Sequence, residues 1–158
     1  MRLRQGFKGA WIALLAVALD RASKAAVLRL NSSGPLAPGL LNLAPVENAG
    51  MAFSMFSGRR LALIAVAVLL VVGLLAWLLR KPEAQPVFRA GLWLILGGGL
   101  GNLFDRIVRG TVTDFLEFAF VRFAVFNVAD VCVCLGAALA VIGAILEDMA
   151  AGHSPGRQ

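Results

Sequence analysis

Two aspartates in the last third of the chain are the strongest candidates for chemistry. Asp114 follows a long apolar run, and Asp130 stands at the start of the next one. Neither has a basic residue within helical reach along the chain. One continuous helix would hold the two residues about 24 Å apart. They can therefore meet only if the chain leaves one run, makes a U-turn and re-enters as the next.

Two carboxylates brought side by side cannot easily both ionise. Mutual repulsion lets them share one proton, so that one acts as a base and the other as an acid. Such a pair can activate water against an amide and protonate the departing nitrogen. The alternative for Asp130 is structural, since aspartate favours the N-cap of a helix. The residues alone leave both interpretations open.

Other charged and polar residues lie where a membrane makes them costly. An unpaired ionisable group in a bilayer is unfavourable by several kcal/mol. Asp20 and Lys24 are four residues apart and share a helix face, so we expect an ion pair, with a role beside an active site as the alternative. Asn102, Asp105 and Arg106 share the end of another apolar run, where we expect Asp105 and Arg106 to form a buried polar brace.

The glycines at 97, 98, 99 and 101 precede this polar group. Glycine in a membrane helix permits close approach of a neighbouring helix. A phosphate-binding loop is excluded, because no strand precedes the glycines and no Gly-Lys-Ser/Thr follows them. Cys132 and Cys134 are interpreted as packing residues, and the single histidine, His153, lies in a polar tail. We therefore expect neither a metal site nor a cofactor.

The composition is that of a membrane protein. The chain has 158 residues, is 59% hydrophobic and carries a net charge of +6, whereas soluble domains are about 45–50% apolar. So short a chain cannot bury that excess, which must face lipid, and we expect one domain over residues 1–158. The lysines and arginines flank apolar runs and form no block, which favours anionic headgroups and topology control over nucleic acid.

Four apolar runs are long enough to span hydrocarbon as helices, which takes about 20 residues. They cover about residues 10–30, 61–79, 90–107 and 129–146. The first could instead be a cleaved signal peptide, given its basic start and the Ala16-Val17-Ala18 site. Its apolar character resumes after Asp20, which favours a transmembrane helix.

Four spans place both termini on one side of the membrane. Basic residues at 2, 4, 8, 80, 81 and 89 predict that this side is cytoplasmic, although further arginines fall on the other side. The tryptophans at 11, 77 and 93 all fall at the inner helix ends, as in an interfacial belt.

The two outer loops differ in composition. Residues 31–60 are rich in proline and glycine, which predicts short strands or an extended platform. The loop over 108–128 holds half of the chain's phenylalanines between 115 and 126, which suits a segment in the headgroup region. The predicted fold class is an all-α membrane protein with four transmembrane helices, a small extracytoplasmic β platform and an interfacial segment.

The polar motifs, taken in order, resemble those of a known family, the lipoprotein signal peptidases (signal peptidase II). Any one motif is weak, but four in order on the expected helices and loops are specific, and they cover nearly the whole chain. They are DRASK at 20–24, ENAGMAFS at 47–54, GNLFDR at 101–106 with Gly110, Val112, Asp114 and Phe115, and FNVAD at 126–130.

The resemblance implies an aspartic endopeptidase that removes the signal peptide from prolipoproteins. Its substrate carries diacylglycerol on a cysteine, and cleavage falls just before that cysteine. It implies Asp114 and Asp130 as the catalytic pair. It also implies that Asp20, Lys24, Asn48, Gly50, Asn102, Asp105, Arg106 and Asn127 line or brace the site.

The same resemblance implies a monomer in the bacterial cytoplasmic (inner) membrane, with the site at the outer face and globomycin as an inhibitor. Three residues depart from the family pattern: Arg21 and Ser23 stand where Gln and Thr are usual, and Met51 where Ala or Gly is common. They leave the catalytic pair intact and put fine specificity in question.

Three other functions compete with this interpretation. A channel or transporter could use the acids as an ion or proton path, but all of them except Asp20 gather toward one face or lie in solvent. A serine peptidase would need Lys24 and Ser54 as a dyad. A purely structural membrane subunit would leave the outer acids without a purpose.

Overall fold

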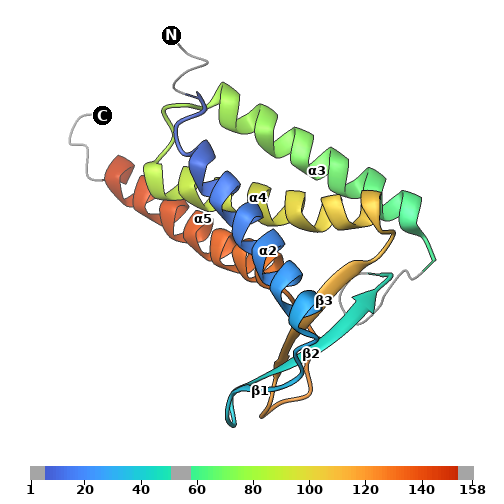
Figure 1. The fold of residues 1–158 in the computed structure, drawn as a ribbon. Helices are drawn as coiled ribbons and strands as arrows, with labels where there is room; N and C mark the ends of the chain where they lie inside the picture. The colour runs from blue at the N-terminus through green and yellow to red at the C-terminus, as the bar shows by residue number, and fades with distance from the viewer. Residues whose placement is uncertain (1–5, 51–57, 153–158) are drawn as a thin grey trace.

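The computed structural model describes residues 6–50 and 58–152, and Met51 and Ser54 lie outside these ranges. Each of the four ranges predicted to be helical lies within an observed helix (Figure 1). Three strands complete the described fold. In chain order the elements are α2 (Ala10–Leu30), β1 (Gly34–Ala37), β2 (Leu41–Asn48), α3 (Arg60–Arg80), α4 (Pro86–Val108), β3 (Val112–Phe118) and α5 (Val128–Gly152).

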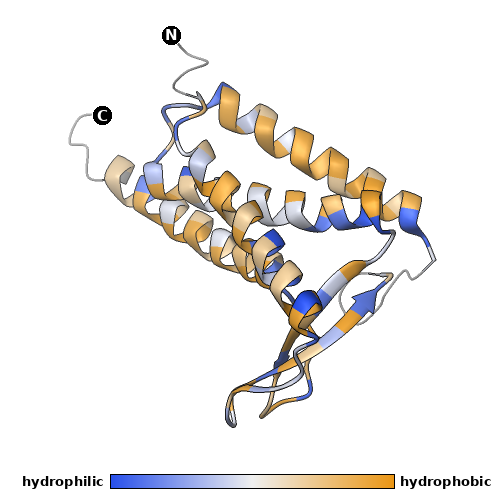
Figure 2. Cartoon of the chain, in the orientation of Figure 1, coloured by the Kyte–Doolittle hydropathy of each residue, from blue (hydrophilic) through white to orange (hydrophobic). Residues whose placement is uncertain are grey.

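Within the described residues, three helices are long and apolar enough to cross a membrane. They are α3, α4 and the Val128–Ala151 part of α5. Helix α2 is as long as α3, at 21 residues, but Asp20, Arg21 and Lys24 interrupt its apolar sequence. Figure 2 shows the apolar residues spread along the helices and hydrophilic ones near their ends and in the sheet. The protein is therefore a helical membrane protein.

Helix α4 is the centre of the bundle and packs against the other three helices. Its glycines make this possible, as predicted. A Cβ at Gly97 would lie 2.7 Å from the Ala13 carbonyl oxygen of α2, and one at Gly98 would collide with the Ala129 carbonyl of α5. A Cβ at Gly101 would lie 2.8 Å from an Asp20 carboxylate oxygen. Gly99 has only an ordinary contact, with Val71 of α3 at 3.8 Å.

The buried apolar core lies toward the end of the bundle away from the sheet. It comprises Ala13, Leu78, Leu92, Trp93 and Leu96. Trp93 is 2% exposed and donates its indole N–H to the Lys8 carbonyl at 2.9 Å. Close helix packing therefore encloses Trp93, which does not face the lipid as a residue of an interfacial belt would, whereas Trp11 is 66% exposed.

The strands form one antiparallel sheet in the order β1-β2-β3. It extends from one end of the helix bundle, while α2 begins and α5 ends at the opposite end (Figure 1). The strand β3 comes from the second outer loop, where the sequence predicted an interfacial segment only. Its β-branched and aromatic residues Val112, Thr113, Phe115 and Phe118 favour a strand, and this signal was overlooked.

Candidate active site

Asn127 joins the two aspartates. Its side-chain Nδ2 donates to Asp114 Oδ1 at 2.6 Å. It also exchanges two hydrogen bonds with Asp130: Asn127 Oδ1 accepts from the Asp130 backbone N–H at 3.0 Å, and Asp130 Oδ2 accepts from the Asn127 N–H at 3.1 Å. Asn127 is fully buried. The U-turn expected between the aspartates therefore brings both carboxylates to one buried residue, Asn127.

The exchange between Asn127 and Asp130 is a capping box at the start of α5. Helix α5 begins at Val128, so Asn127 occupies the N-cap and Asp130 the third helical position. The structural interpretation of Asp130 thus holds in a modified form, because Asp130 completes the cap without being the cap residue. Only Oδ2 of Asp130 takes part in this cap, and Oδ1 faces another partner.

That partner is Asn102 of α4, whose Nδ2 donates to Asp130 Oδ1 at 2.8 Å. The Oδ1 atom of Asn102 accepts from Lys24 Nζ at 3.2 Å and from Asn127 Nδ2 at 3.0 Å. A lysine ammonium can only donate, so Lys24 requires the oxygen of the Asn102 amide to face it. The amide nitrogen is then directed at Asp130.

Asp114 lies on β3, 3% exposed, and receives its second donor from the neighbouring strand. Asn48 of β2 donates from Nδ2 to Asp114 Oδ2 at 2.9 Å, while Asn48 Oδ1 accepts from the Gly50 N–H at 2.9 Å. Burial raises the pKa of the Asp114 carboxyl above its usual range, and the charge of Asp130 also raises it. The donors Asn48 and Asn127 and the cation Lys24 lower this pKa, but by less.

A buried ion cluster (Asp20, Arg21, Lys24, Asp105) supports the pair from α2 and α4. Lys24 Nζ lies 2.9 Å from the Asp20 carboxylate and 2.8 Å from Asp105, so the predicted ion pair is confirmed and extended. The Arg21 guanidinium donates hydrogen bonds to both carboxylate oxygens of Asp105, at 2.6 and 2.8 Å, and to Asp20 at 3.0 Å. Both aspartates are fully buried, and the two cations balance their charge.

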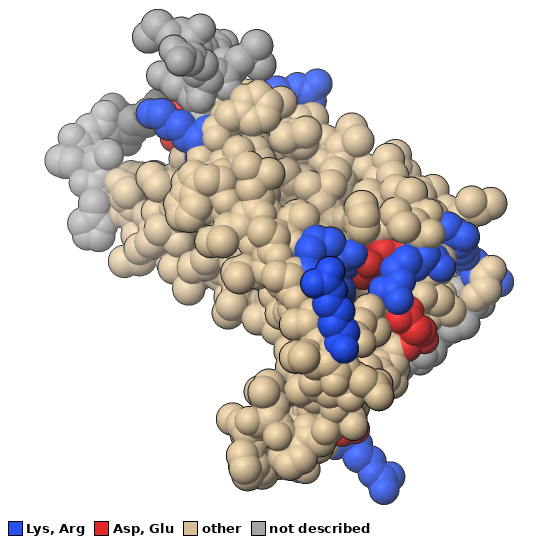
Figure 3. All heavy atoms as spheres, viewed as in Figure 1, with Lys and Arg blue, Asp and Glu red and all other residues tan. Residues whose placement is uncertain are grey.

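Asp105 and Arg106 are adjacent in sequence but have different hydrogen-bond partners. Asp105 belongs to the ion cluster, whereas Arg106 donates to the Gly50 carbonyl at 2.8 Å and to the Asn102 carbonyl at 3.3 Å. Arg106 thus links α4 to Gly50, two residues after Asn48. The space-filling view shows charged atoms of both signs gathered where the bundle meets the sheet (Figure 3).

The structure brings all ten predicted site residues into this one region. Sequence reasoning did not assign Arg21 to the site; its position next to Asp20 and one turn from Lys24 was the available signal. Lys24 is committed to three oxygen acceptors, and Ser54, its partner in the serine-peptidase alternative, lies outside the described residues. Over residues 6–50 and 58–152, no cluster of His, Cys, Asp and Glu is suited to a metal ion.

Fold and site together define a class of protein: a helical membrane protein with two aspartates hydrogen-bonded to one buried asparagine at one end of its bundle. Comparison with known proteins gives the family. The family model for signal peptidase (SPase) II matches residues 12–146. The chain belongs to the signal peptidase II family.

Similarity to individual proteins supports the same family assignment. Proteins named lipoprotein signal peptidase are 42% identical in Gloeobacter violaceus, 40% in Symbiobacterium thermophilum and 37% in Yersinia pestis. These alignments cover 87%, 87% and 90% of this chain and 82%, 93% and 89% of the relatives. A solved structure described as a bacterial membrane enzyme shares the fold with a TM-score of 0.84, at 24% identity over 96% of this chain and 94% of its own.

Proposed function

We propose that Asp114 and Asp130 are the catalytic dyad with which this enzyme cleaves prolipoproteins. The activity follows from the family: the chain is an aspartic endopeptidase that removes signal peptides from prolipoproteins. The observation that carries the residue assignment is their joint attachment to Asn127. Asp114 accepts from the side-chain amide of Asn127 and Asp130 from its backbone N–H, and the desolvation of both carboxyls favours a state in which only one of them is ionised.

In the proposed reaction, the ionised carboxylate takes a proton from water as the water oxygen attacks the scissile carbonyl carbon. The protonated partner donates its proton to the carbonyl oxygen. The carboxyl that took the water proton then gives it to the amide nitrogen, while the other carboxylate takes a proton back from a hydroxyl of the tetrahedral diol, and the C–N bond breaks. One product ends in a new carboxylate, and the other begins with the free amine of the lipid-modified cysteine.

Asn48, Asn102 and Asn127 position the dyad in this proposal, and the ion cluster positions Asn102. Each dyad carboxylate accepts two hydrogen bonds, which fixes both oxygens of each group. A fixed orientation of the carboxylates raises the rate of a two-carboxylate reaction, because the reacting atoms must meet within about 3.5 Å. Arg106 holds Gly50 next to this group.

For the membrane arrangement, we propose that α2 is the fourth span of a protein in the bacterial cytoplasmic (inner) membrane. Its 21 residues reach about 31 Å as helix, close to the hydrocarbon thickness. The interruptions Asp20, Arg21 and Lys24 are neutralised within the ion cluster. Both termini would then be cytoplasmic and the sheet extracytoplasmic, which places the dyad where lipid headgroups meet water.

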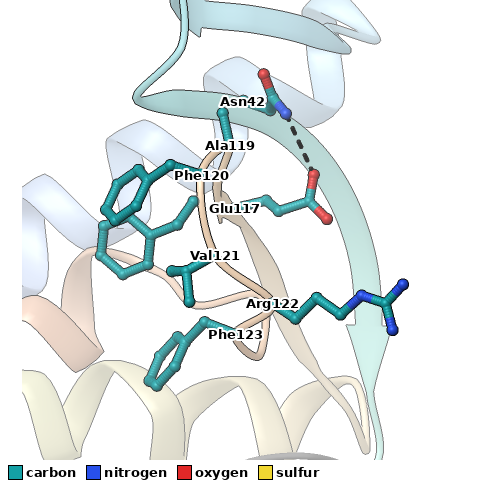
Figure 4. A pocket seen from close by; sticks show the side chains of 8 residues that line it. Asn42, Glu117, Ala119, Phe120, Val121, Arg122 and Phe123 are labelled. Atoms are coloured by element: carbon teal, nitrogen blue, oxygen red, sulfur yellow. Dashed lines mark hydrogen bonds between the residues drawn. The ribbon is translucent and has the colours of Figure 1, made fainter.

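The proposed substrate, a prolipoprotein with diacylglycerol on its cysteine, remains anchored in the same membrane. The segment after β3 fits an interfacial location (Figure 4). Phe120, Val121 and Phe123 project to one side and Arg122 to the other, and Phe120 and Phe123 are 65% and 53% exposed. Amphipathic aromatic segments of this kind lie among headgroups. The shallow depression of about 410 Å³ beside it is lined by none of the dyad residues.

The test is a cleavage assay with the purified enzyme in detergent and a prolipoprotein that carries diacylglycerol. We expect a mobility shift with the lipidated substrate, none with the unlipidated form, and inhibition by globomycin. A monomeric enzyme should show specific activity that is independent of dilution. Equal cleavage of the unlipidated form would contradict the substrate assignment, and ion flux in proteoliposomes would favour the transporter alternative instead.

A further inference from the structure

A second hydrogen-bonded group lies on the sheet, on the strand face opposite to Asn48. We call it the Glu47 clasp; its members are Glu47, Arg109, Thr111 and Thr113. Glu47 Oε1 accepts from Thr113 Oγ1 at 3.0 Å and from Arg109 at 3.2 Å, and Glu47 Oε2 accepts from the Thr111 hydroxyl. Arg109 also donates to Thr113 Oγ1 at 2.8 Å. The two oxygens of one exposed carboxylate therefore join β2 to β3 and to the loop that precedes β3.

The clasp lies just beyond an irregularity in the pairing of β2 with β3. Leu43 pairs with Leu116, but the next pair is Val46 with Asp114. Two residues of β2 thus oppose the single residue Phe115, which is a β-bulge. One of the two is Pro45, which has no N–H to donate to the ladder. The part of the sheet that reaches the dyad is therefore shifted by one residue relative to the register of the outer part.

That register decides which side chain of β2 meets Asp114. In the observed register Asn48 opposes Val112 and Glu47 opposes Thr113, so Asn48 and Asp114 share a face. Without the bulge, β2 would slip by one residue, and such a slip turns every side chain to the other face. Asn48 would then point away from Asp114, and Glu47 would add a third carboxylate beside the dyad.

We propose that Glu47 is a positioning residue whose clasp on Arg109, Thr111 and Thr113 holds β2 in the register that directs the Asn48 amide at Asp114. Glu47 itself touches neither dyad carboxylate. The inference rests on the proposed function, since the register matters to catalysis only if Asp114 is catalytic.

The first test is the pH dependence of kcat/KM. Asn48 lowers the pKa of Asp114, so loss of register raises that pKa. Glu47→Ala should therefore move the alkaline limb of the profile to higher pH and reduce kcat roughly fivefold, as for one lost hydrogen bond, with KM nearly unchanged. The other groups that act on Asp114 stay in place: Asn127, Asp130 on α5, Lys24 on α2 and Arg106 on α4.

A double-mutant cycle separates positioning from a general loss of structure. If the clasp acts through Asn48, Glu47→Ala combined with Asn48→Ala should behave as Asn48→Ala alone. Glu47→Gln keeps an acceptor oxygen and should restore most of the activity. Arg109→Met, which leaves β2 unchanged, should give a smaller shift in the same direction and serves if Glu47→Ala folds poorly. Additive effects, or an unmoved alkaline limb, would overturn the proposal.

Glu117→Gln is the matched control, because Glu117 also has a cross-strand partner, Asn42 at 3.4 Å, but on the other side of the bulge. Glu117→Gln should leave both kcat and the alkaline limb of the pH profile unchanged. Hydrogen exchange of residues 46–48 and 112–114, which needs no substrate, should accelerate in Glu47→Ala and stay unchanged in Glu117→Gln. If Asp114→Asn cleaves normally, the dyad assignment fails whatever the exchange shows. If Asp114→Asn is inactive but Glu47→Ala changes neither exchange nor pH profile, only the clasp fails.

Discussion

At the scale of single residues, Asn127 carries an unusual number of tasks. It caps α5, donates to Asp114, donates to Asn102 and exchanges hydrogen bonds with Asp130. The start of a helix is thereby used as the meeting point of two acids from different elements. A side chain with both a donor and an acceptor is needed there, so aspartate at this position could not perform the same role.

The protonation of the dyad leads to a prediction about pH. Activity requires one protonated and one ionised carboxyl, so kcat/KM should be bell-shaped. Burial raises the pKa of Asp114, and the alkaline limb should therefore lie above the ordinary range of aspartate. Asn48→Ala removes a donor that lowers this pKa, so the limb should move to still higher pH. Asn42→Ala, which removes a hydrogen bond to Glu117, should leave the profile unchanged.

The ion cluster predicts an effect on stability. Asp105→Asn removes a buried carboxylate that faces both Arg21 and Lys24. Breaking a buried pair from one side costs about 3 kcal/mol or more, because the partner charges remain. Thermal unfolding in detergent should show a Tm lower by several degrees. Asp148→Asn, at the exposed end of α5, is the control, and an equal Tm in both variants would show that the cluster does not stabilise the fold.

The residues of this site were predictable only in part. The i, i+4 spacing of Asp20 and Lys24 is a local signal, and the ion pair followed from it. Arg21 was not assigned, because its partner Asp105 is 84 residues away and no spacing rule reaches across two helices. Asp114, Asp130 and the polar group at 102–106 stood out as polar residues at the ends of apolar runs. Only the motifs of the family supplied Asn48, Gly50 and Asn127, which composition and periodicity could not have selected.

At the scale of elements, close packing of α4 against α5 sets the position of Asp130. The Gly98 Cα faces the Ala129 carbonyl, where a Cβ would collide with backbone. Asp130 follows Ala129 directly, so any displacement of α5 here moves the dyad. Helix lengths and the apolar runs were readable from the sequence, whereas β3 was not recognised because its seven residues are short and carry no clean alternation.

Glycine substitutions test this packing. Gly98→Ala should force α4 and α5 apart, lower stability by about 1–3 kcal/mol and reduce cleavage, since Asp130 shifts away from Asn102. Gly73→Ala is the matched control: Gly73 lies on α3, where an added Cβ would meet no atom of the described residues within 4 Å, and stability should stay the same or rise by up to about 1 kcal/mol, because alanine favours a helix over glycine. Thermal unfolding measures the stability of each variant, and the cleavage assay measures its activity. Similar losses of stability and activity in the two variants would argue against specific packing at Gly98.

At the scale of the whole molecule, the polar groups are segregated along the bundle. Asp20, Lys24, Asp105 and Asp130 lie toward the sheet end, while the apolar core centred on Trp93 lies toward the other. The described structure thus offers no continuous chain of buried acids along its length. Arg89, buried near the other end, donates to the carbonyls of Leu78, Lys81 and Gly6, a structural use of its charge.

The proposed orientation predicts the behaviour of reporter fusions. Alkaline phosphatase is active only where its disulfides form, outside the cytoplasm. Fusions after Gly39 or Val121 should be active, and fusions after Glu83 or Ala151 should be inactive. A fluorescent protein that matures only in the cytoplasm should give the opposite pattern at the same four positions. Active phosphatase after Glu83 would contradict the combination of cytoplasmic termini with α2 as a fourth span.

Cleavage by single aspartate variants tests the central assignment most directly. Asp114→Asn and Asp130→Asn, purified in detergent, should each lose about a thousandfold or more of the cleavage rate on a diacylglyceryl-modified prolipoprotein. Their unfolding temperatures should stay near that of the unsubstituted enzyme, because each asparagine keeps the size of the group it replaces. Cleavage at the normal rate by either variant would show that these two carboxylates are not the catalytic pair.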